Sequence, residues 1–220
     1  MKEVFTAFLA EEMGVPASEI SFDDERFRAE GSNLTPTMLD VAEMARDKGR
    51  DDLLTHHERA TLDGRSFPNG AHICEVVIDP ETGIVTTDRY TVVDDFGNLI
   101  NPLLAEGQVH GGVVQGIGQA LQERVVYDED GQLLTASFMD YAMPRALDVP
   151  YISFTSEPVP STANIMGMKG CGEAGTVGAL AAVSNAVQDA LWEHGVRQAD
   201  MPFTPHKVWE LLQGEAIAAE

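Results

Sequence analysis

The sequence is poor in cysteine, in basic residues and in long apolar runs. Two cysteines in 220 residues are too few for a disulfide framework or for the ligands of an iron–sulfur cluster. No run of roughly 18 apolar residues suggests a membrane-spanning helix. With 14 basic against 36 acidic side chains and a formal net charge of −22, nucleic acid and anionic membranes are excluded as partners. The composition predicts a cytoplasmic protein.

The histidines show no metal-ligand spacing either. Six are present, and the run His56-His57-Glu58 lacks the H-E-x-x-H pattern that places two histidines on one helix face. We therefore predict no metal site built from protein side chains. His110 falls in a glycine-rich helical segment, where helix packing and a place near a ligand both remain open.

Hydrophobic patterns predict an α+β fold of mixed sheets with packed helices, because strands and helices cluster without regular β–α alternation. We expect helices at residues 4–13, 101–121, 176–192 and 205–212, and one that begins with Thr35 as its N-cap and ends near Arg46. We expect strands at residues 20–23, 26–29, 72–79, 84–93, 125–127, 132–135 and 151–155. A charged connector suggests two lobes, residues 1–66 and 67–220.

One carboxylate, Glu173, stands among closely spaced glycines just before an apolar helix. Glycine lacks a Cβ and tolerates positive φ, so Gly170, Gly172 and Gly175 permit a sharp turn and close approach to a large ligand. Desolvation raises the pKa of a carboxyl group, whereas the positive end of a helix dipole lowers it, and the sequence leaves the balance open. The pattern predicts that Glu173 is presented as a general base.

The same residues, from Gly170 to Gly175, spell Gly-x-Gly-x-x-Gly, the fingerprint of dinucleotide-binding folds. That interpretation requires a buried strand directly before the first glycine. Residues 156–164 are instead rich in proline and small polar side chains, and a glutamate within the turn would repel a pyrophosphate. A nicotinamide site is therefore disfavoured.

A second glycine-rich segment, residues 101–121, has the apolar spacing of a helix. Each interior glycine costs a helix roughly 1 kcal/mol relative to alanine, so a backbone or a cofactor is expected to lie against the bare side that Gly107, Gly111 and Gly118 form. The side chains of Gln108, Gln115 and Gln119 offer donors and acceptors suited to a pterin-like ring. Tight helix packing with surface glutamines is the alternative.

Together with the segment at residues 92–102, these motifs resemble one family. The chain is similar to the C-terminal part of the molybdopterin-binding large subunit of xanthine dehydrogenases, aldehyde oxidases and carbon monoxide dehydrogenases, the molybdenum hydroxylases. The resemblance covers about residues 5–212. The motifs that carry it, in order, are residues 67–70, 76–83, 92–102, 115–121, 139–144 and 169–175.

The resemblance implies roles for particular residues. Glu173 matches the base beside molybdenum in a hydroxylation whose oxygen comes from water. The residues that match segments lining the cofactor are Gln108, Gly111, Gln115, Gly116, Lys169, Gly170, Cys171 and Gly172. Cys171 is interpreted as a small side chain near the cofactor and not as a nucleophile.

The resemblance also implies a cofactor and partners. The cofactor is molybdenum–molybdopterin, as a cytosine dinucleotide or a related form, with iron–sulfur and FAD groups on partner chains only. The N-terminal half of a large subunit is expected as a further partner or region. The substrate is an aldehyde, a heteroaromatic compound or carbon monoxide. The alternative is a non-catalytic interaction module that keeps the fold and is inactive without that half.

Overall fold

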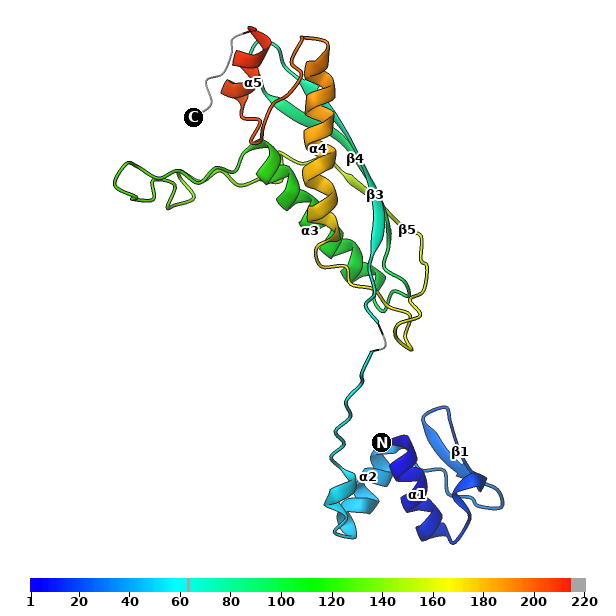
Figure 1. Ribbon diagram of the computed structural model, residues 1–220. Coiled ribbons are helices and arrows are strands. Elements are labelled where there is room, and N and C mark those ends of the chain that lie inside the picture. Colours follow the sequence, from blue (N-terminus) through cyan, green and yellow to red (C-terminus); the bar gives the residue numbers. More distant parts are fainter. Residues whose placement is uncertain (63, 215–220) are drawn as a thin grey trace. The chain divides into compact units, whose positions relative to one another are not determined.

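The computed structural model describes residues 1–62 and 64–214; residue 63 and residues 215–220 of the two expected lobes lie outside it. The chain forms two compact units, Met1–Thr61 and Leu62–Glu220, and each has its own hydrophobic core. Helices and small sheets occur in both (Figure 1), which confirms the predicted α+β class. Among the described residues, no helix is both long and apolar enough to cross a membrane.

The N-terminal unit packs two helices against a two-stranded antiparallel sheet. Its elements are α1 (Lys2–Met13), the short 3₁₀ helix η1 (Ala17–Glu19), β1 (Ile20–Asp23), β2 (Arg26–Ala29), α2 (Met38–Asp47) and the 3₁₀ helix η2 (Asp51–Leu53). The buried side chains of Phe5, Phe27 and Val41 come from α1, β2 and α2 and meet in the core. The predicted hairpin and first helix are confirmed.

The N-cap predicted for α2 is wrong by two residues. Thr37, not Thr35, caps the helix: Thr37 Oγ1 accepts from Asp40 N at 3.2 Å, and Asp40 Oδ2 accepts from Thr37 N at 2.8 Å. This reciprocal capping box gives a hydrogen-bond acceptor to the backbone N–H of Thr37 and to that of Asp40. The predicted start had relied instead on a proline at the first helical position. Thr35 instead offers its carbonyl oxygen to the Arg26 guanidinium at 2.9 Å.

The C-terminal unit is built on a three-stranded sheet in the order β3–β4–β5. β3 pairs antiparallel with β4, and β4 pairs parallel with β5. The elements of this unit are β3 (Asn69–Ile78), β4 (Val85–Asp95), α3 (Pro102–Leu121), β5 (Ile152–Ser156), α4 (Ala174–Trp192) and α5 (Pro205–Leu212). The long hairpin and the three predicted helices are confirmed, although α4 begins two residues before the position expected.

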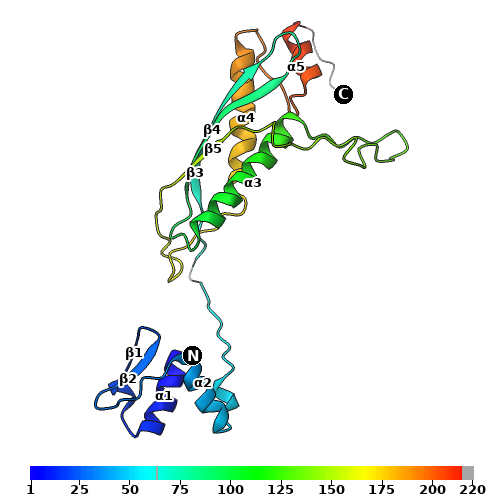
Figure 2. The ribbon, with the colours of Figure 1, turned by 180° about the vertical axis from the view of Figure 1, so that it is seen from behind.

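Helices α3 and α4 lie on the same side of this sheet in both views (Figures 1 and 2). Side chains alternate between the faces of a strand, so Tyr90 and Val92 of β4 point into the core beneath the helices and are fully buried. Ile73 and Val77 of β3, on the opposite face, are exposed. The parallel pairing of β4 with β5 requires a long crossover, which includes α3.

Close contact between α3 and α4 depends on glycine. A Cβ on Gly112 would lie 2.9 Å from Thr176 N, and one on Gly116 would lie 2.4 Å from Ala179 Cβ. Of the three glycines on the expected bare side, Gly118 packs closely, because a Cβ there would lie 2.7 Å from Pro144 Cδ. A Cβ on Gly107 or Gly111 would meet nothing within 4 Å. Glycine on α3 serves helix packing on one face and leaves the other face open.

Between α3 and β5 a long loop extends away from the helices and the sheet (Figures 1 and 2), although Pro144 lies against Gly118 of α3 and Val149 packs on the core. The two strands expected at 125–127 and 132–135 do not form; a single bridge joins Tyr127 to Leu133. The turn at Gly131 has a φ of +81°, as a glycine turn permits. The turn predicted at Asp130-Gly131 therefore forms, but too few backbone hydrogen bonds join the flanking residues to define two strands.

The same substitution at two glycines of α3 tests the helix contact. Gly116→Ala is expected to destabilise the C-terminal unit by about 1–3 kcal/mol, because the added methyl group overlaps Ala179 Cβ. Gly107→Ala is expected to stabilise it by about 0.5–1 kcal/mol, because space is free and alanine favours a helix. Urea unfolding followed by circular dichroism measures both. Equal stabilisation by the two variants would contradict the close contact.

A second pair of variants tests the corrected cap of α2. Thr37→Ala is expected to lower the stability of the N-terminal unit by about 1 kcal/mol, because the donor at Asp40 N loses its acceptor. Thr35→Ala keeps the carbonyl that Arg26 uses and is the matched control, with little change expected. Thermal unfolding of the chain compares them, and a larger loss from Thr35→Ala would restore the original assignment.

Candidate active site around Glu173

Glu173 occupies the N-cap position of α4 and is exposed. Its side chain makes no capping hydrogen bond to the first turn. The first N–H groups of a helix have no partner within the helix, and they carry the positive end of its dipole. The Glu173 carboxylate therefore stands beside unpaired donor groups and positive potential.

The start of α4 is fixed against α3. A Cβ on Gly175 would lie 2.5 Å from Val109 O and 2.9 Å from Val113 N, so only glycine fits there. Thr176 Oγ1 donates to the Gly112 carbonyl at 3.0 Å and lies 3.4 Å from Gln115 Oε1. One end of the loop that carries Glu173 is thus held by direct backbone contact between two helices.

The other end of that loop is held by the segment that follows β4. Lys169 N donates to Phe96 O at 2.8 Å, and Asn98 N donates to Gly167 O at 3.0 Å. The Asn98 side chain donates to Met166 O at 2.9 Å. Gly97, with a φ of +62°, comes so close that a Cβ would lie 2.0 Å from Gly167 O. Only glycine permits this approach.

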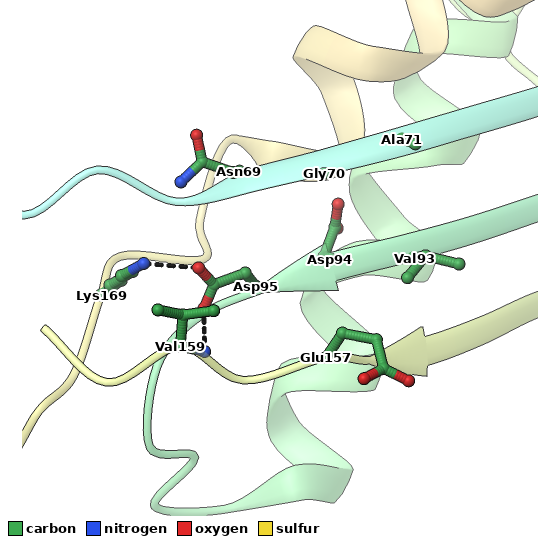
Figure 3. Close-up of a pocket in the computed structure, with 9 residues that line it drawn as sticks. All are labelled: Asn69, Gly70, Ala71, Val93, Asp94, Asp95, Glu157, Val159 and Lys169. Carbon is green, nitrogen blue, oxygen red and sulfur yellow. Dashed lines mark hydrogen bonds and ion pairs between the residues drawn. The ribbon is translucent and has the colours of Figure 1, made fainter.

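A nearly buried ion pair reinforces this junction (Figure 3). Lys169 Nζ lies 2.5 Å from Asp95 Oδ2, and the two side chains are only 10% and 11% exposed. The other oxygen, Asp95 Oδ1, accepts from Gly97 N at 2.8 Å and from Val159 N at 2.9 Å. The Lys169 hydrogen bond, followed by those two backbone donors, lowers the pKa of Asp95 to about 2.

Asp95 and Lys169 also border an open cavity of about 430 Å³ at the end of the sheet (Figure 3). Its other lining residues are Asn69, Gly70, Ala71, Val93, Asp94, Glu157 and Val159. Glu173 does not line this cavity, and neither do the glutamines of α3. The cavity and the candidate base are therefore separate features of the C-terminal unit.

The side chain of Asp94 points into the protein, away from the side that Asp95 faces, because consecutive strand residues face opposite sides of a sheet. It is 2% exposed, and its Oδ1 lies 3.5 Å from His72 Nε2. His72 Nδ1 lies 2.9 Å from the hydroxyl of Tyr90, whose pKa is raised by burial. The His72 ring lies so close to Gly178 that a Cβ there would come within 2.5 Å of it. This network fixes the next turn of α4 over the sheet.

The structure places the expected cofactor-lining residues in three different settings. Gln108, Gly111 and Gln115 are exposed on α3, and Gly170 and Gly172 are exposed with no heavy atom within 4 Å of an added Cβ. Cys171 is half-buried against the core. Gly116 is buried under Ala179 and Lys169 is paired with Asp95, so packing and an ion pair already account for these two.

The residues present fit a large organic group that is rich in hydrogen-bond acceptors. Bare backbone at Gly170 and Gly172, the uncapped first turn of α4 and the amide of Gln115 supply hydrogen-bond donors on one exposed surface. Such a surface suits ring-edge acceptors. Within residues 1–62 and 64–214, no cluster of three or more His, Cys, Asp or Glu side chains could hold a metal ion by itself.

Neither cysteine shows the features of a nucleophile. Cys74 lies half-buried on β3, where burial raises the pKa of its thiol to about 11. Its thiolate is therefore scarce near neutral pH. Cys171 packs against the core beside the Glu173 loop, in keeping with a small structural side chain.

Asp95, Asn98 and Thr176 hold the candidate base in place, and sequence reasoning gave none of them a role. Asp94 and Asp95 lie in the motif at residues 92–102. Two adjacent acids at the end of a strand could have indicated a charge that needs a partner inside the protein. Two consecutive acids face opposite sides of a strand, so at least one of them needs a partner on the packed side. The partner of Asp95 lies 74 residues away and is not readable from spacing.

Comparison with known proteins shows which family this chain is similar to. Residues 1–150 match the model described as a molybdopterin cofactor-binding domain. The nicotine 6-hydroxylase large subunit of Paenarthrobacter nicotinovorans is 44% identical over 148 residues, covering 67% of this chain and 18% of the relative. The carbon monoxide dehydrogenase large chain of Hydrogenophaga pseudoflava is 32% identical over 208 residues, covering 93% of this chain and 26% of the relative.

Solved structures agree with these relatives. A Cu,Mo-CO dehydrogenase chain matches 97% of this chain with a TM-score of 0.82 and 31% identity, and 27% of that chain is covered. Quinoline 2-oxidoreductase from Pseudomonas putida 86 matches 97% of this chain with a TM-score of 0.79 and 32% identity, and 28% of that chain is covered. The chain spans about a quarter, or less, of the length of these proteins.

The matched family model, the relatives and the shared fold all indicate one family. The chain belongs to the molybdopterin cofactor-binding domain family and corresponds to part of the large subunit of molybdenum hydroxylases.

Proposed function

We propose that this chain is the part of a molybdenum hydroxylase large subunit that supplies the general base, Glu173. The observation that carries the proposal is the place of Glu173: an exposed carboxylate at the uncapped start of α4, beside bare glycine backbone. Residues 67–220 are then the molybdopterin-binding lobe. When bound, the molybdenum–molybdopterin cofactor supplies the electron acceptor and the Lewis acid of a hydroxylation by water.

Each group of this chain has a definite task in that reaction. The Glu173 carboxylate accepts the proton released as water-derived oxygen is transferred to the substrate carbon, and general-base assistance of this kind contributes about 100- to 10,000-fold. Backbone N–H groups at Gly170 and Gly172 and the amides of Gln108 and Gln115 hold the cofactor in register. The α3–α4 contact keeps the base from moving relative to those donors.

We further propose the cofactor form and the partners. We propose the cytosine dinucleotide or a related form of molybdopterin, with the exposed amides of Gln108 and Gln115 on α3 as hydrogen-bond partners. The relatives include a large subunit, a large chain and a protein named as subunit gamma of a dehydrogenase complex. Those names support an assembly of several chains, and we propose iron–sulfur and flavin partner chains together with the remaining part of a large subunit. We propose that the assembly works in the cytoplasm.

The names of the relatives and of one solved structure also support a substrate class. They are named for nicotine, 6-hydroxypseudooxynicotine, carbon monoxide and quinoline. An electrophilic carbon of a heteroaromatic ring is the substrate class that we propose first for this chain, with carbon monoxide and aldehydes as alternatives.

Replacement of the base tests the proposal in the complete, molybdenum-loaded enzyme that contains this chain. Glu173→Gln keeps the shape and removes the proton acceptor, so kcat is expected to fall by about 100- to 10,000-fold. Molybdenum content, measured by mass spectrometry of the metal, is expected to stay unchanged. Glu193→Gln, at the exposed far end of the same helix, is the matched control and should turn over normally.

Near-normal turnover by Glu173→Gln would remove Glu173 as the base. A purified assembly that holds no molybdenum and oxidises no substrate would instead support the alternative, a non-catalytic interaction module with the same fold.

A further inference from the structure

Three chain segments meet at one carboxylate in the C-terminal unit. Asp95 ends β4, and its two oxygens bind the backbone of Gly97, the backbone of Val159 and the ammonium of Lys169. Figure 3 shows Lys169 and Val159 converging on Asp95 from two separate loops. The loop of Lys169 is the one that leads into Glu173.

We propose that the Asp95–Lys169 ion pair is a clamp that positions Glu173, which makes Lys169 a positioning residue and not a ligand of the cofactor. This inference rests on the proposed function for the role of Glu173, but the clamp itself is a property of the chain.

The geometry defines how far the clamp acts. Upstream, the loop is fixed as far as Lys169 by its ion pair and by its backbone bond to Phe96. Downstream, it is fixed from Gly175 by contact with α3. The span between these points, residues 170–174, carries the base and includes two glycines with open space around them. A short, glycine-containing span holds one position only when both of its ends are held.

The ammonium of Lys169 is already committed within the protein. Its side chain is 10% exposed, and its partner Asp95 is ionised and aligned by two backbone donors that do not depend on the lysine. A nearly buried ammonium is costly to separate from its counter-charge. Binding a cofactor phosphate through Lys169 would require breaking this pair and leaving Asp95 without its cation.

Acid provides an independent way to weaken the clamp. The pKa of Asp95 is about 2 in the folded chain, below the value of about 3.9 for an unfolded chain. Its contribution to stability is therefore complete above about pH 4 and is lost as the pH falls toward 2. Lys169 faces the carboxylate, while Asp94 is its neighbour on β4 and Glu157 borders the same cavity. In Asp95→Asn, the part of the pH dependence due to this group should disappear between pH 4 and 2, measured by urea unfolding.

Backbone ¹⁵N relaxation of this 220-residue chain, measured by NMR, tests the clamp without any molybdenum chemistry. Lys169→Met is expected to lower the order parameters of residues 170–174 from about 0.85, the value of a rigid backbone, to below about 0.6, with α3 unchanged. Lys169→Arg keeps a cation for Asp95 and should remain near wild type. Lys207→Met, a lysine of α5 whose ammonium donates to Asp200 O, is the matched control. If Lys169→Met does not fold, Asp95→Asn removes the same ion pair and should lower the order parameters of the same span.

Two outcomes would overturn the clamp. One is wild-type order parameters for residues 170–174 in both Lys169→Met and Asp95→Asn. The other is an equal loss of order across α3, α4 and the loop, which would mean general destabilisation. In the complete enzyme, Lys169→Met should lower kcat with unchanged molybdenum and pterin content; loss of pterin with an unchanged loop would make Lys169 a cofactor ligand. The relaxation measurement reports only on the backbone of this chain, so it tests the clamp even if Glu173 is not the base.

Discussion

The contact of α3 with α4 is the constraint on which the rest of the C-terminal unit depends. Gly112 and Gly175 bring two backbones together where any side chain would overlap, and Thr176 joins the helices by a hydrogen bond to Gly112. Packing at this distance fixes where α4 starts, because interiors do not deform continuously. The position of Glu173, one residue before that start, follows from it.

Glycine serves two different purposes in this chain. At Gly112, Gly116 and Gly175 it allows helices to approach, and at Gly170 and Gly172 it leaves backbone uncovered. The first use stabilises the scaffold and the second exposes donors for a ligand. Gly170 and Gly172 of the bare loop are followed directly by the packed Gly175, so a rigid helix start and a bare loop lie within six residues of each other.

Much of the fold was predictable from local signals. The β3–β4 hairpin follows from β-branched strands around a turn, and α3 and α4 follow from apolar periodicity. Glu173 was identified because its glycine context is unusual. The capping residue of α2 was missed because Thr35 and Thr37 flank the same proline and only the Asp40 side chain distinguishes them. A better match to the capping-box spacing would have favoured Thr37.

Long-range pairings were beyond sequence reasoning. Spacing cannot show that the Lys169 ammonium binds Asp95, or that Gly116 faces Ala179, because both contacts depend on how the helices and the sheet pack. Lys169 and Gly116 were expected to line a cofactor because each belongs to a motif that matches a cofactor-lining segment of the family. Motif membership indicated these segments, whereas the contacts of each side chain within a segment could be seen only in the packed structure.

The most direct test is a crystal structure of the complete, molybdenum-loaded enzyme that contains this chain. The account predicts that the Glu173 carboxylate faces the molybdenum centre, with bare backbone at Gly170 and Gly172 against the cofactor and Lys169 still bound to Asp95. A structure in which Glu173 points to bulk solvent away from the metal, or in which another carboxylate occupies that position, would contradict it.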